Sequence, residues 1–146
     1  PYGVLQSLIR EADLTATLLS VARVTRPGSM VGIDLVPDVP RWSEYRRRVS
    51  LKGRLGRSGK RLTLIESVRQ DRRRKLTIFD QEYLEVKSKT SKKTHRFSLA
   101  FRTLSIPQMI RRVERVGFQI EEVLGDYQGR PWDTQSDVWI IIVSRK

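Results

Sequence analysis

The residues whose types could take part in chemistry lie mostly where predicted strands end. Asp34 lies near the end of an apolar run over residues 30–36 that predicts a strand buried on both faces. In open α/β sheets, ligand-facing residues gather at such strand ends, although an ion pair with an arginine such as Arg41 is an equal alternative. Trp42 and Tyr45 follow the strand and can either wall a substrate pocket or pack as core aromatics. These three residues are candidate substrate-binding residues.

Three further residues extend the candidate substrate site. Arg102 is expected on the sheet face opposite Phe97 and Phe101, where its guanidinium can bind a carboxylate or phosphate, and a solvated arginine is the alternative. Tyr127 and Trp132 lie in the last long loop. They either contact substrate or anchor that loop to the sheet.

The composition excludes several classes of catalytic site. The chain of 146 residues has no cysteine, which excludes disulfides and thiolate metal sites and favours a reducing compartment such as the cytoplasm. The single histidine, His95, cannot form a metal site or a Ser-His-Asp triad elsewhere in the chain, and we interpret it as a surface residue. No run approaches the ~18 apolar residues of a membrane span.

The positive charge of the chain is concentrated in its middle. The formal net charge is +13, and residues 46–102 contain 19 Lys or Arg and 5 Asp or Glu, a net +14. This segment is either a solvated basic surface or a site for anions or nucleic acid. Gly53, Gly56 and Gly59 lie within it, but basic residues surround them and no helical stripe follows, so we reject them as a nucleotide-binding loop.

On either side of the basic segment, the spacing of apolar residues predicts alternating helices and strands. Residues 11–24 predict a helix, with Leu14, Leu18 and Val21 forming its apolar stripe. Ser105 and Gln108 form a capping-box pattern for a second helix that ends at Gly117. Further elements are the strands expected over residues 30–36, 118–124 and 138–143.

The basic segment itself has a period of two. Residues 61–68, 76–86 and 94–103 alternate between apolar and polar side chains, which predicts an antiparallel meander of three strands. The glycines that precede it predict a flexible entry loop, and residues 42–48 predict a short helix.

Four short motifs resemble class I S-adenosylmethionine-dependent methyltransferases. Val24-Thr25-Arg26-Pro27-Gly28-Ser29 resembles the turn between their fourth helix and fifth strand, with Ser29 in place of a second glycine. Arg115-Val116-Gly117-Phe118 resembles their turn into the sixth strand, with valine replacing alanine. The other two are the loop over residues 125–132, which resembles the loop before their last strand, and the opening residues 1–8, which resemble the stretch after their fourth strand.

The resemblance implies an α/β fold: the C-terminal part of a Rossmann-like sheet, strands five to seven, with the last pair antiparallel. Residues 1–146 would be a single partial methyltransferase domain, with 46–103 as an inserted basic β-meander. The loop of about ten residues before the final strand is too short for a helical crossover, which independently favours the antiparallel pair.

The resemblance also implies a function. It implies methyl transfer from S-adenosylmethionine to a small-molecule acceptor, with Tyr2, Gly3 and Gln6 bordering the cofactor. The glycine-rich cofactor loop is missing, and the chain starts at Pro1, so we expect it to be part of a longer protein and inactive alone. The alternative function is a basic nucleic-acid-binding module, or part of an RNA methyltransferase.

The resemblance predicts a partner for the chain. The seventh strand of this family lies between the fifth and the sixth, so the strand over residues 30–36 would have one open edge. That edge contains no proline or lysine to discourage pairing. We therefore expect the chain to pair with its missing N-terminal half or with a second copy.

Overall fold

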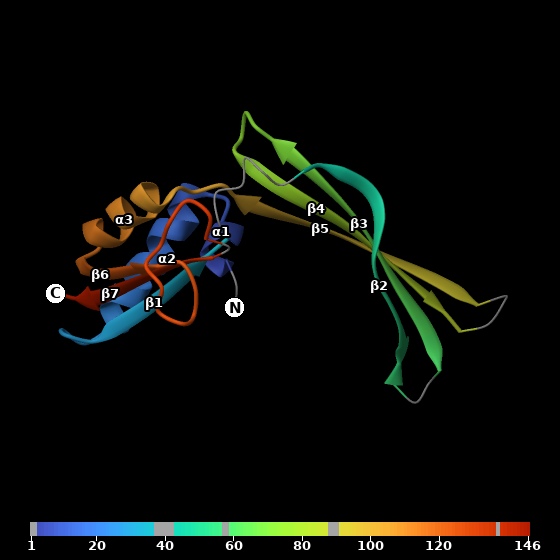
Figure 1. Ribbon diagram of the computed structural model, residues 1–146, viewed down its shortest axis with the longest axis horizontal. Helices are drawn as coiled ribbons and strands as arrows, with labels where there is room; N and C mark the ends of the chain where they lie inside the picture. Colours follow the sequence, from blue (N-terminus) through green and yellow to red (C-terminus); the bar gives the residue numbers. More distant parts are fainter. Residues whose placement is uncertain (1–2, 37–42, 57–58, 88–90, 137) are drawn as a thin grey trace. The chain divides into compact units, whose positions relative to one another are not determined.

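The computed structural model describes residues 3–36, 43–56, 59–87, 91–136 and 138–146 (Figure 1). Its contacts divide the chain into two compact units. The first, which we call the helical unit, comprises Pro1–Pro40 and Arg102–Lys146. The second, the meander unit, comprises Arg41–Phe101.

The helical unit contains a three-stranded sheet in the order β1-β7-β6, with β7 antiparallel to both neighbours. This confirms the predicted strand order and the antiparallel final pair. The elements of the unit are α1 (Val4–Ser7), α2 (Glu11–Val24), β1 (Met30–Leu35), α3 (Ile106–Arg115), β6 (Phe118–Leu124) and β7 (Trp139–Arg145).

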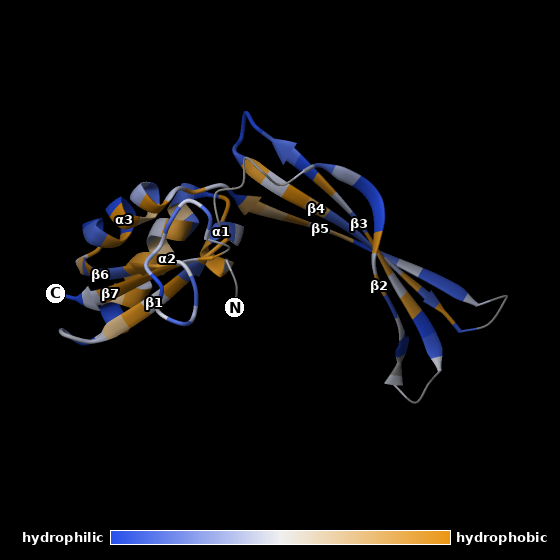
Figure 2. Ribbon diagram, viewed as in Figure 1, coloured by the Kyte–Doolittle hydropathy of each residue, from blue (hydrophilic) through white to orange (hydrophobic). Residues whose placement is uncertain are grey.

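The core of the helical unit lies between this sheet and the helices. Leu14 and Leu18 of α2 and Met109 of α3 are buried in one cluster with Ile141 of β7. Figure 2 shows hydrophobic residues along β1 and β7. The apolar stripe expected over residues 11–24 therefore packs on the sheet, as does Met109 of α3, and burial of this apolar surface is the main stabilising term of the unit.

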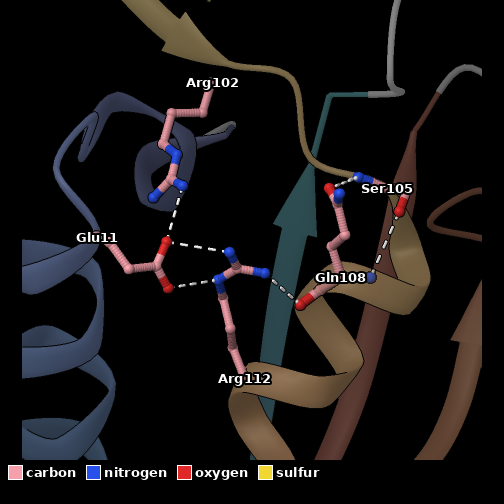
Figure 3. Close-up of polar contacts among 5 residues, drawn as sticks. All are labelled: Glu11, Arg102, Ser105, Gln108 and Arg112. Atoms are coloured by element: carbon pink, nitrogen blue, oxygen red, sulfur yellow. Dashed lines mark hydrogen bonds and ion pairs between the residues drawn. The ribbon is translucent and has the colours of Figure 1, made fainter. Parts of the chain in front are cut away.

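The ends of α3 are formed by side-chain and backbone features that the sequence predicted. Ser105 Oγ accepts a hydrogen bond from the backbone N–H of Gln108 at 3.4 Å. In return, Gln108 Oε1 accepts a hydrogen bond from the backbone N–H of Ser105 at 3.1 Å (Figure 3). This reciprocal pair is the expected capping box. Gly117 follows the helix with φ 90, in the region that other residues rarely adopt, so the expected left-handed stop is confirmed.

Strand β1 differs from the prediction that it is buried on both faces. Ile33 and Leu35 are buried on the face that meets the helices, whereas Met30 is 66% exposed on the other face. The helices of the described chain cover only one face of the sheet, so the apolar composition of β1 exceeds what these residues bury.

The meander unit is a four-stranded antiparallel sheet in the order β2-β3-β4-β5. Its strands are β2 (Tyr45–Leu55), β3 (Lys60–Asp71), β4 (Leu76–Val86) and β5 (Lys92–Arg102). Three strands were predicted, and β2 is the one that the sequence did not show. A short helix was expected over residues 42–48, but the described residues from Tyr45 onward belong to β2. The strand also includes Gly53, which was expected in a loop.

Two irregularities explain why β2 was missed. The pairing of β2 with β3 shifts register between Tyr45 and Arg48, and again between Val49 and Leu51. Each shift interrupts the alternation of side chains, so no clean period of two remains in the sequence. Gly56 and Gly59, at φ 49 and 63, lie at the turn that follows.

The two faces of the meander sheet differ in chemistry. Paired residues of neighbouring strands share a face, and Leu64 pairs with Tyr83 while Val68 pairs with Phe79. We call this the apolar face. The residues next to these in each strand point to the opposite face, which we call the charged face. Ser67 and its partner Asp80 are an example.

Candidate functional site

The candidate site of the helical unit lies at the carboxyl end of β1, where the side chain of Gln6 joins three segments. Gln6 is 2% exposed. Its Nε2 donates to the carbonyl oxygens of Val36 at 3.0 Å and Arg102 at 3.2 Å, and its Oε1 accepts from the Val36 amide at 2.8 Å. A buried amide with these partners fixes the relative positions of α1, the end of β1 and the backbone of Arg102.

Gly3, the residue before α1, is required by the same packing. Its φ of 66 lies in the left-handed region, and a Cβ atom there would lie 3.0 Å from both Gln6 Oε1 and Val36 Cγ2. Glycine therefore allows α1 to approach the end of β1 closely.

Two of the candidate substrate-binding residues meet at this end of β1. The Tyr127 hydroxyl donates to Asp34 Oδ2 at 3.0 Å. The two residues are 93 positions apart, and Tyr127 is 66% exposed. The alternative partner proposed for Asp34, Arg41, lies outside the described residues. The pair places a carboxylate and a phenol together at an accessible rim, where they can accept and donate hydrogen bonds to a polar ligand.

Arg102 takes part in an ion-pair network (Figure 3). Its Nη2 donates to Glu11 Oε2 at 2.8 Å. Arg112 donates to the same carboxylate from Nε at 2.9 Å and from Nη2 at 3.0 Å. The hydrogen bonds from Arg112, and then those from Arg102, lower the pKa of Glu11 from 4.5 to about 2.

Nothing in the sequence marks Glu11 and Arg112 as members of one network. Glu11 and Arg112 are 101 positions apart, so no local spacing links them. The available signal was weak: an acidic residue in the first turn of one predicted helix, and arginines on the polar side of another. For Arg102, contact with a substrate anion stays a prediction, since its guanidinium already binds Glu11.

The remaining candidates are dispersed. Trp132 is 37% exposed and packs edge-to-face on Trp139, with the ring centroids 6.1 Å apart. Tyr45 belongs to the meander unit, where the Arg48 guanidinium lies 5.7 Å from the centre of its ring. Tyr2 and Trp42 lie outside the described residues. The structure thus brings Asp34, Tyr127, Gly3 and Gln6 to one end of β1.

A groove follows the unpaired edge of β1. Within the part of the chain that the structure describes, β1 pairs only with β7, and its other edge faces no strand. A cavity of about 200 Å³ beside this edge is lined by Leu5, Leu18, Val21, Val31 and Ile33, among others. The groove is therefore apolar and offers unpaired backbone groups, which is a surface that accepts another strand.

The described residues provide little for a cofactor to bind. Each polar atom of the Gln6 side chain already has a backbone partner, and Gly3 is explained by packing against Gln6 and Val36. The residues present therefore do not fit S-adenosylmethionine as a self-sufficient site. No described helix has the length and apolar character needed to cross a membrane.

Comparison with solved structures identifies the fold. A S-adenosylmethionine-dependent methyltransferase from Clostridium acetobutylicum matches with a TM-score of 0.75 and 9% identity, over 97% of this chain and 54% of that protein. The sugar N-methyltransferase KedS8 from Streptoalloteichus matches with a TM-score of 0.74 and 14% identity, over 100% and 54%. CalS10, an amino pentose methyltransferase from Micromonospora echinaspora, matches with a TM-score of 0.68 and 12% identity, over 100% and 56%.

These matches show the fold of S-adenosylmethionine-dependent methyltransferases, in agreement with the resemblance seen in the sequence. The chain therefore has a class I methyltransferase fold over nearly its whole length. It spans about half the length of the methyltransferases that it matches. No protein-family model and no curated protein sequence matches it.

Proposed function

We propose that this chain is the C-terminal part of a class I methyltransferase that transfers a methyl group from S-adenosylmethionine to a small-molecule acceptor. In this proposal β1, β6 and β7 are the fifth, sixth and seventh strands of the sheet, and the meander unit is an insertion between the fifth strand and the next helix. The observation that carries it is the strand order β1-β7-β6, with β7 antiparallel to both neighbours, in a chain that matches such enzymes from end to end.

The partner in this proposal is an N-terminal part that carries the glycine-rich cofactor loop. Its fourth strand would pair with the open edge of β1 and cover the groove lined by Leu18, Val21 and Val31. Pairing would satisfy the edge backbone groups and bury the apolar lining, which together favour association. The same packing would explain why β1 is more apolar than the described residues require.

Asp34 and Tyr127 are the residues that we assign to the acceptor. Methyl transfer needs orientation of the acceptor more than acid–base chemistry, because the cofactor carries the reactive group. A carboxylate hydrogen-bonded to a phenol can hold an amine or hydroxyl group of the acceptor in one orientation. Gln6 and Gly3 act as positioning residues, since they fix the end of β1 next to that pair.

The test compares this chain with a longer protein translated from the coding sequence upstream of Pro1. Calorimetry with S-adenosylmethionine should detect binding to the longer protein and none, or only very weak binding, to this chain. Transfer of a labelled methyl group should first be tried on amino sugars, because KedS8 and CalS10 are described as sugar and amino pentose methyltransferases.

Two outcomes would contradict the proposal. Tight cofactor binding by this chain alone would mean that the cofactor site is not divided as proposed. Failure of the longer protein to bind the cofactor would show that the protein is not a methyltransferase.

If the longer protein is active, Asp34→Asn and Tyr127→Phe should raise the Michaelis constant for the acceptor and leave cofactor affinity unchanged.

Nucleic-acid binding is a second candidate function, and one feature of the meander unit favours it. Arg54 and Arg61 lie directly opposite each other on neighbouring strands, and neither has an acidic partner among the described side chains. Like charges in this arrangement are unfavourable unless an anion joins them. Binding to single-stranded RNA should then weaken steeply as salt rises, and no binding at low salt would remove this candidate.

A further inference from the structure

The loop between β6 and β7 brings Tyr127 to Asp34, although little burial of apolar surface holds that loop in place. Residues 127–135 are all exposed, and Tyr127 itself is 66% exposed. A loop whose side chains stay in solvent keeps one conformation only where polar contacts fix its backbone. The path of this loop is therefore set by hydrogen bonds.

Backbone hydrogen bonds close the base of the loop. The N–H of Gly125 donates to the Arg130 carbonyl at 2.8 Å, and the N–H of Trp132 donates to the Val123 carbonyl at 3.0 Å. These two bonds fix where the loop leaves β6 and where it returns. They do not fix the tip of the loop, which includes Tyr127.

The carboxylate of Asp126 organises the tip. Its Oδ1 accepts hydrogen bonds from the backbone N–H groups of Gln128 at 2.8 Å and Arg130 at 3.0 Å. Its Oδ2 lies 3.3 Å from Arg130 Nε. Gly129, with φ 89, supplies the left-handed residue of the turn. A carboxylate that binds its own backbone two and four residues further on holds the residues between them in one conformation.

The pKa of Asp126 agrees with this role. The backbone hydrogen bond from Arg130, ahead of the one from Gln128, lowers the pKa of the Asp126 carboxyl. Bonds that favour the ionised form shift a pKa in this direction. The carboxylate is therefore the form that the turn stabilises.

Tyr127 lies inside this turn, directly after Asp126. Its hydroxyl donates to Asp34 Oδ2 at 3.0 Å. Once the backbone on both sides of Tyr127 is fixed, only the two side-chain torsions of the tyrosine remain to be set. The hydrogen bonds and the ion pair of Asp126 described above go to Gln128 and Arg130, so they act on the Asp34–Tyr127 pair through the loop backbone.

We propose that Asp126 is a positioning residue for the methyl acceptor: it sets the turn that holds the Tyr127 hydroxyl against Asp34. This inference rests on the proposed function, in which Asp34 and Tyr127 orient the acceptor. Groups that orient a substrate are effective only when their own supports hold them in place.

The geometry also assigns the role to one part of Asp126. The backbone hydrogen bonds carry it, and the ion pair with Arg130 contributes little because the Arg130 side chain is 85% exposed. An uncharged side chain with an oxygen acceptor should therefore replace Asp126, whereas a side chain without an acceptor should not.

Hydrogen exchange and the ring resonances of Tyr127 test the turn on this chain, without cofactor or acceptor. In Asp126→Ala the amides of Gln128 and Arg130 should exchange at least about tenfold faster, and the Tyr127 ring resonances should shift. Asp126→Asn keeps an acceptor oxygen and should stay close to the parent. Arg130→Ala is the matched control, because it removes the ion pair and keeps the backbone N–H. Unchanged exchange of the β7 amides would confirm that each variant is folded.

A double-mutant cycle in the longer protein tests the effect on the acceptor. Asp126→Ala should raise the Michaelis constant for the acceptor about as much as Tyr127→Phe does, with cofactor affinity unchanged. Because Asp126 acts through Tyr127, adding Asp126→Ala to Tyr127→Phe should raise the constant no further. Asp126→Asn should keep the parent value.

Three results would overturn the proposal. Parent-like exchange in Asp126→Ala would show that Asp126 does not set the turn. Additive effects of Asp126→Ala and Tyr127→Phe would show that it does not act through Tyr127. Equal losses in Asp126→Asn and Asp126→Ala would assign the effect to charge. If the longer protein fails to bind the cofactor, the proposed function fails, whereas the exchange and ring measurements on this chain still decide whether Asp126 sets the turn.

Discussion

The two units of this chain are stabilised in different ways. In the helical unit, α2 and α3 pack on a sheet, and Leu14, Met109 and Ile141 are each 0% exposed. In the meander unit, a single sheet has long strands but few buried apolar side chains. Among the described residues these are Val68, Leu76 and Ile78. One unit depends on packing between layers, the other mainly on cross-strand contacts within a layer.

The difference suggests which unit is complete. A packed interior is intolerant of lost volume, whereas a single-layer sheet with an uncovered apolar face gains stability when a partner arrives. The helical unit has its own incomplete surface, the edge of β1, but its core is already formed. We therefore expect substitutions in the helical unit to lower the free energy of unfolding more than comparable substitutions in the meander unit.

The largest effect is expected from matched truncations of two phenylalanines. Phe118 is 1% exposed in the core of the helical unit, and Phe118→Ala should lower the free energy of unfolding of that unit by about 3–5 kcal/mol. Phe97→Ala, at a concentration where the chain is monomeric, should cost about 1 kcal/mol, mainly through its contact with Tyr83.

Hydrogen exchange resolved by segment can report each unit separately. The amides of β7 should lose protection in Phe118→Ala, and those of β4 and β5 should respond little to Phe97→Ala. Equal losses of protection in the two variants would show that the meander unit has a packed interior like that of the helical unit.

Removal of the buried amide of Gln6 should have the second-largest effect. Gln6→Ala leaves the Val36 amide and two backbone carbonyls without their partner in a buried position, at a cost of about 2–3 kcal/mol. The amide of Val36 should exchange faster as a direct consequence. Ser7→Ala is the control, because Ser7 Oγ donates to the Val4 carbonyl at 2.7 Å on the exposed side of the same helix. An unchanged rate at Val36 would show that Gln6 does not hold the end of β1.

The sequence predicted the helical unit well because its patterns are local. The stripe of Leu14 and Leu18, the capping box at Ser105 and the glycine stop at Gly117 each depend on neighbours within a few turns. Strand β2 was missed because its register shifts erase the alternation around Val49. A bulge is set by the partner strand, which a single segment does not contain.

The candidate site was less predictable than the fold. Asp34 and Tyr127 were named separately as ligand candidates, but their hydrogen bond spans 93 positions and depends on the path of the last loop. The role of Gln6 in joining Val36 to Arg102 has no signature in the sequence either, since both partners are backbone carbonyls. Contacts of this kind follow from the tertiary structure and not from residue types.

The ion-pair network of the helical unit should give a pH-dependent effect of about 1 kcal/mol. Its two arginines lower the pKa of Glu11 from 4.5 to about 2, so the folded state prefers the ionised carboxylate. The stabilisation is present above pH 4.5 and is lost as the pH falls toward 2. The size is modest because the Glu11 side chain is 51% exposed and screened by solvent.

Glu11→Gln tests this network through the pH dependence of unfolding. The variant should be less stable than the parent at neutral pH, and the two stabilities should converge as the pH falls from 4.5 toward 2. Asp13→Asn is the control for charge in the first turn of α2, because Asp13 lies 3.8 Å from Arg10 on the exposed surface. A parallel pH response of both variants would attribute the effect to the helix dipole and not to Arg102 and Arg112.

The smallest effect is expected from an ion pair on the charged face of the meander unit. Arg69 Nε lies 3.0 Å from Asp80 Oδ2, and the side chains are 59% and 43% exposed. Hydrogen bonds from Ser98 and then Arg69 lower the pKa of Asp80, but the Ser98 bond at 2.7 Å would remain in Arg69→Ala. Because both charges are well solvated, Arg69→Ala should change the free energy of unfolding by less than about 0.5 kcal/mol, and added salt should reduce the change further. A loss as large as that of Glu11→Gln, and insensitive to salt, would show that these cross-strand ion pairs support the single-layer sheet as strongly as the arginine network supports the helical unit.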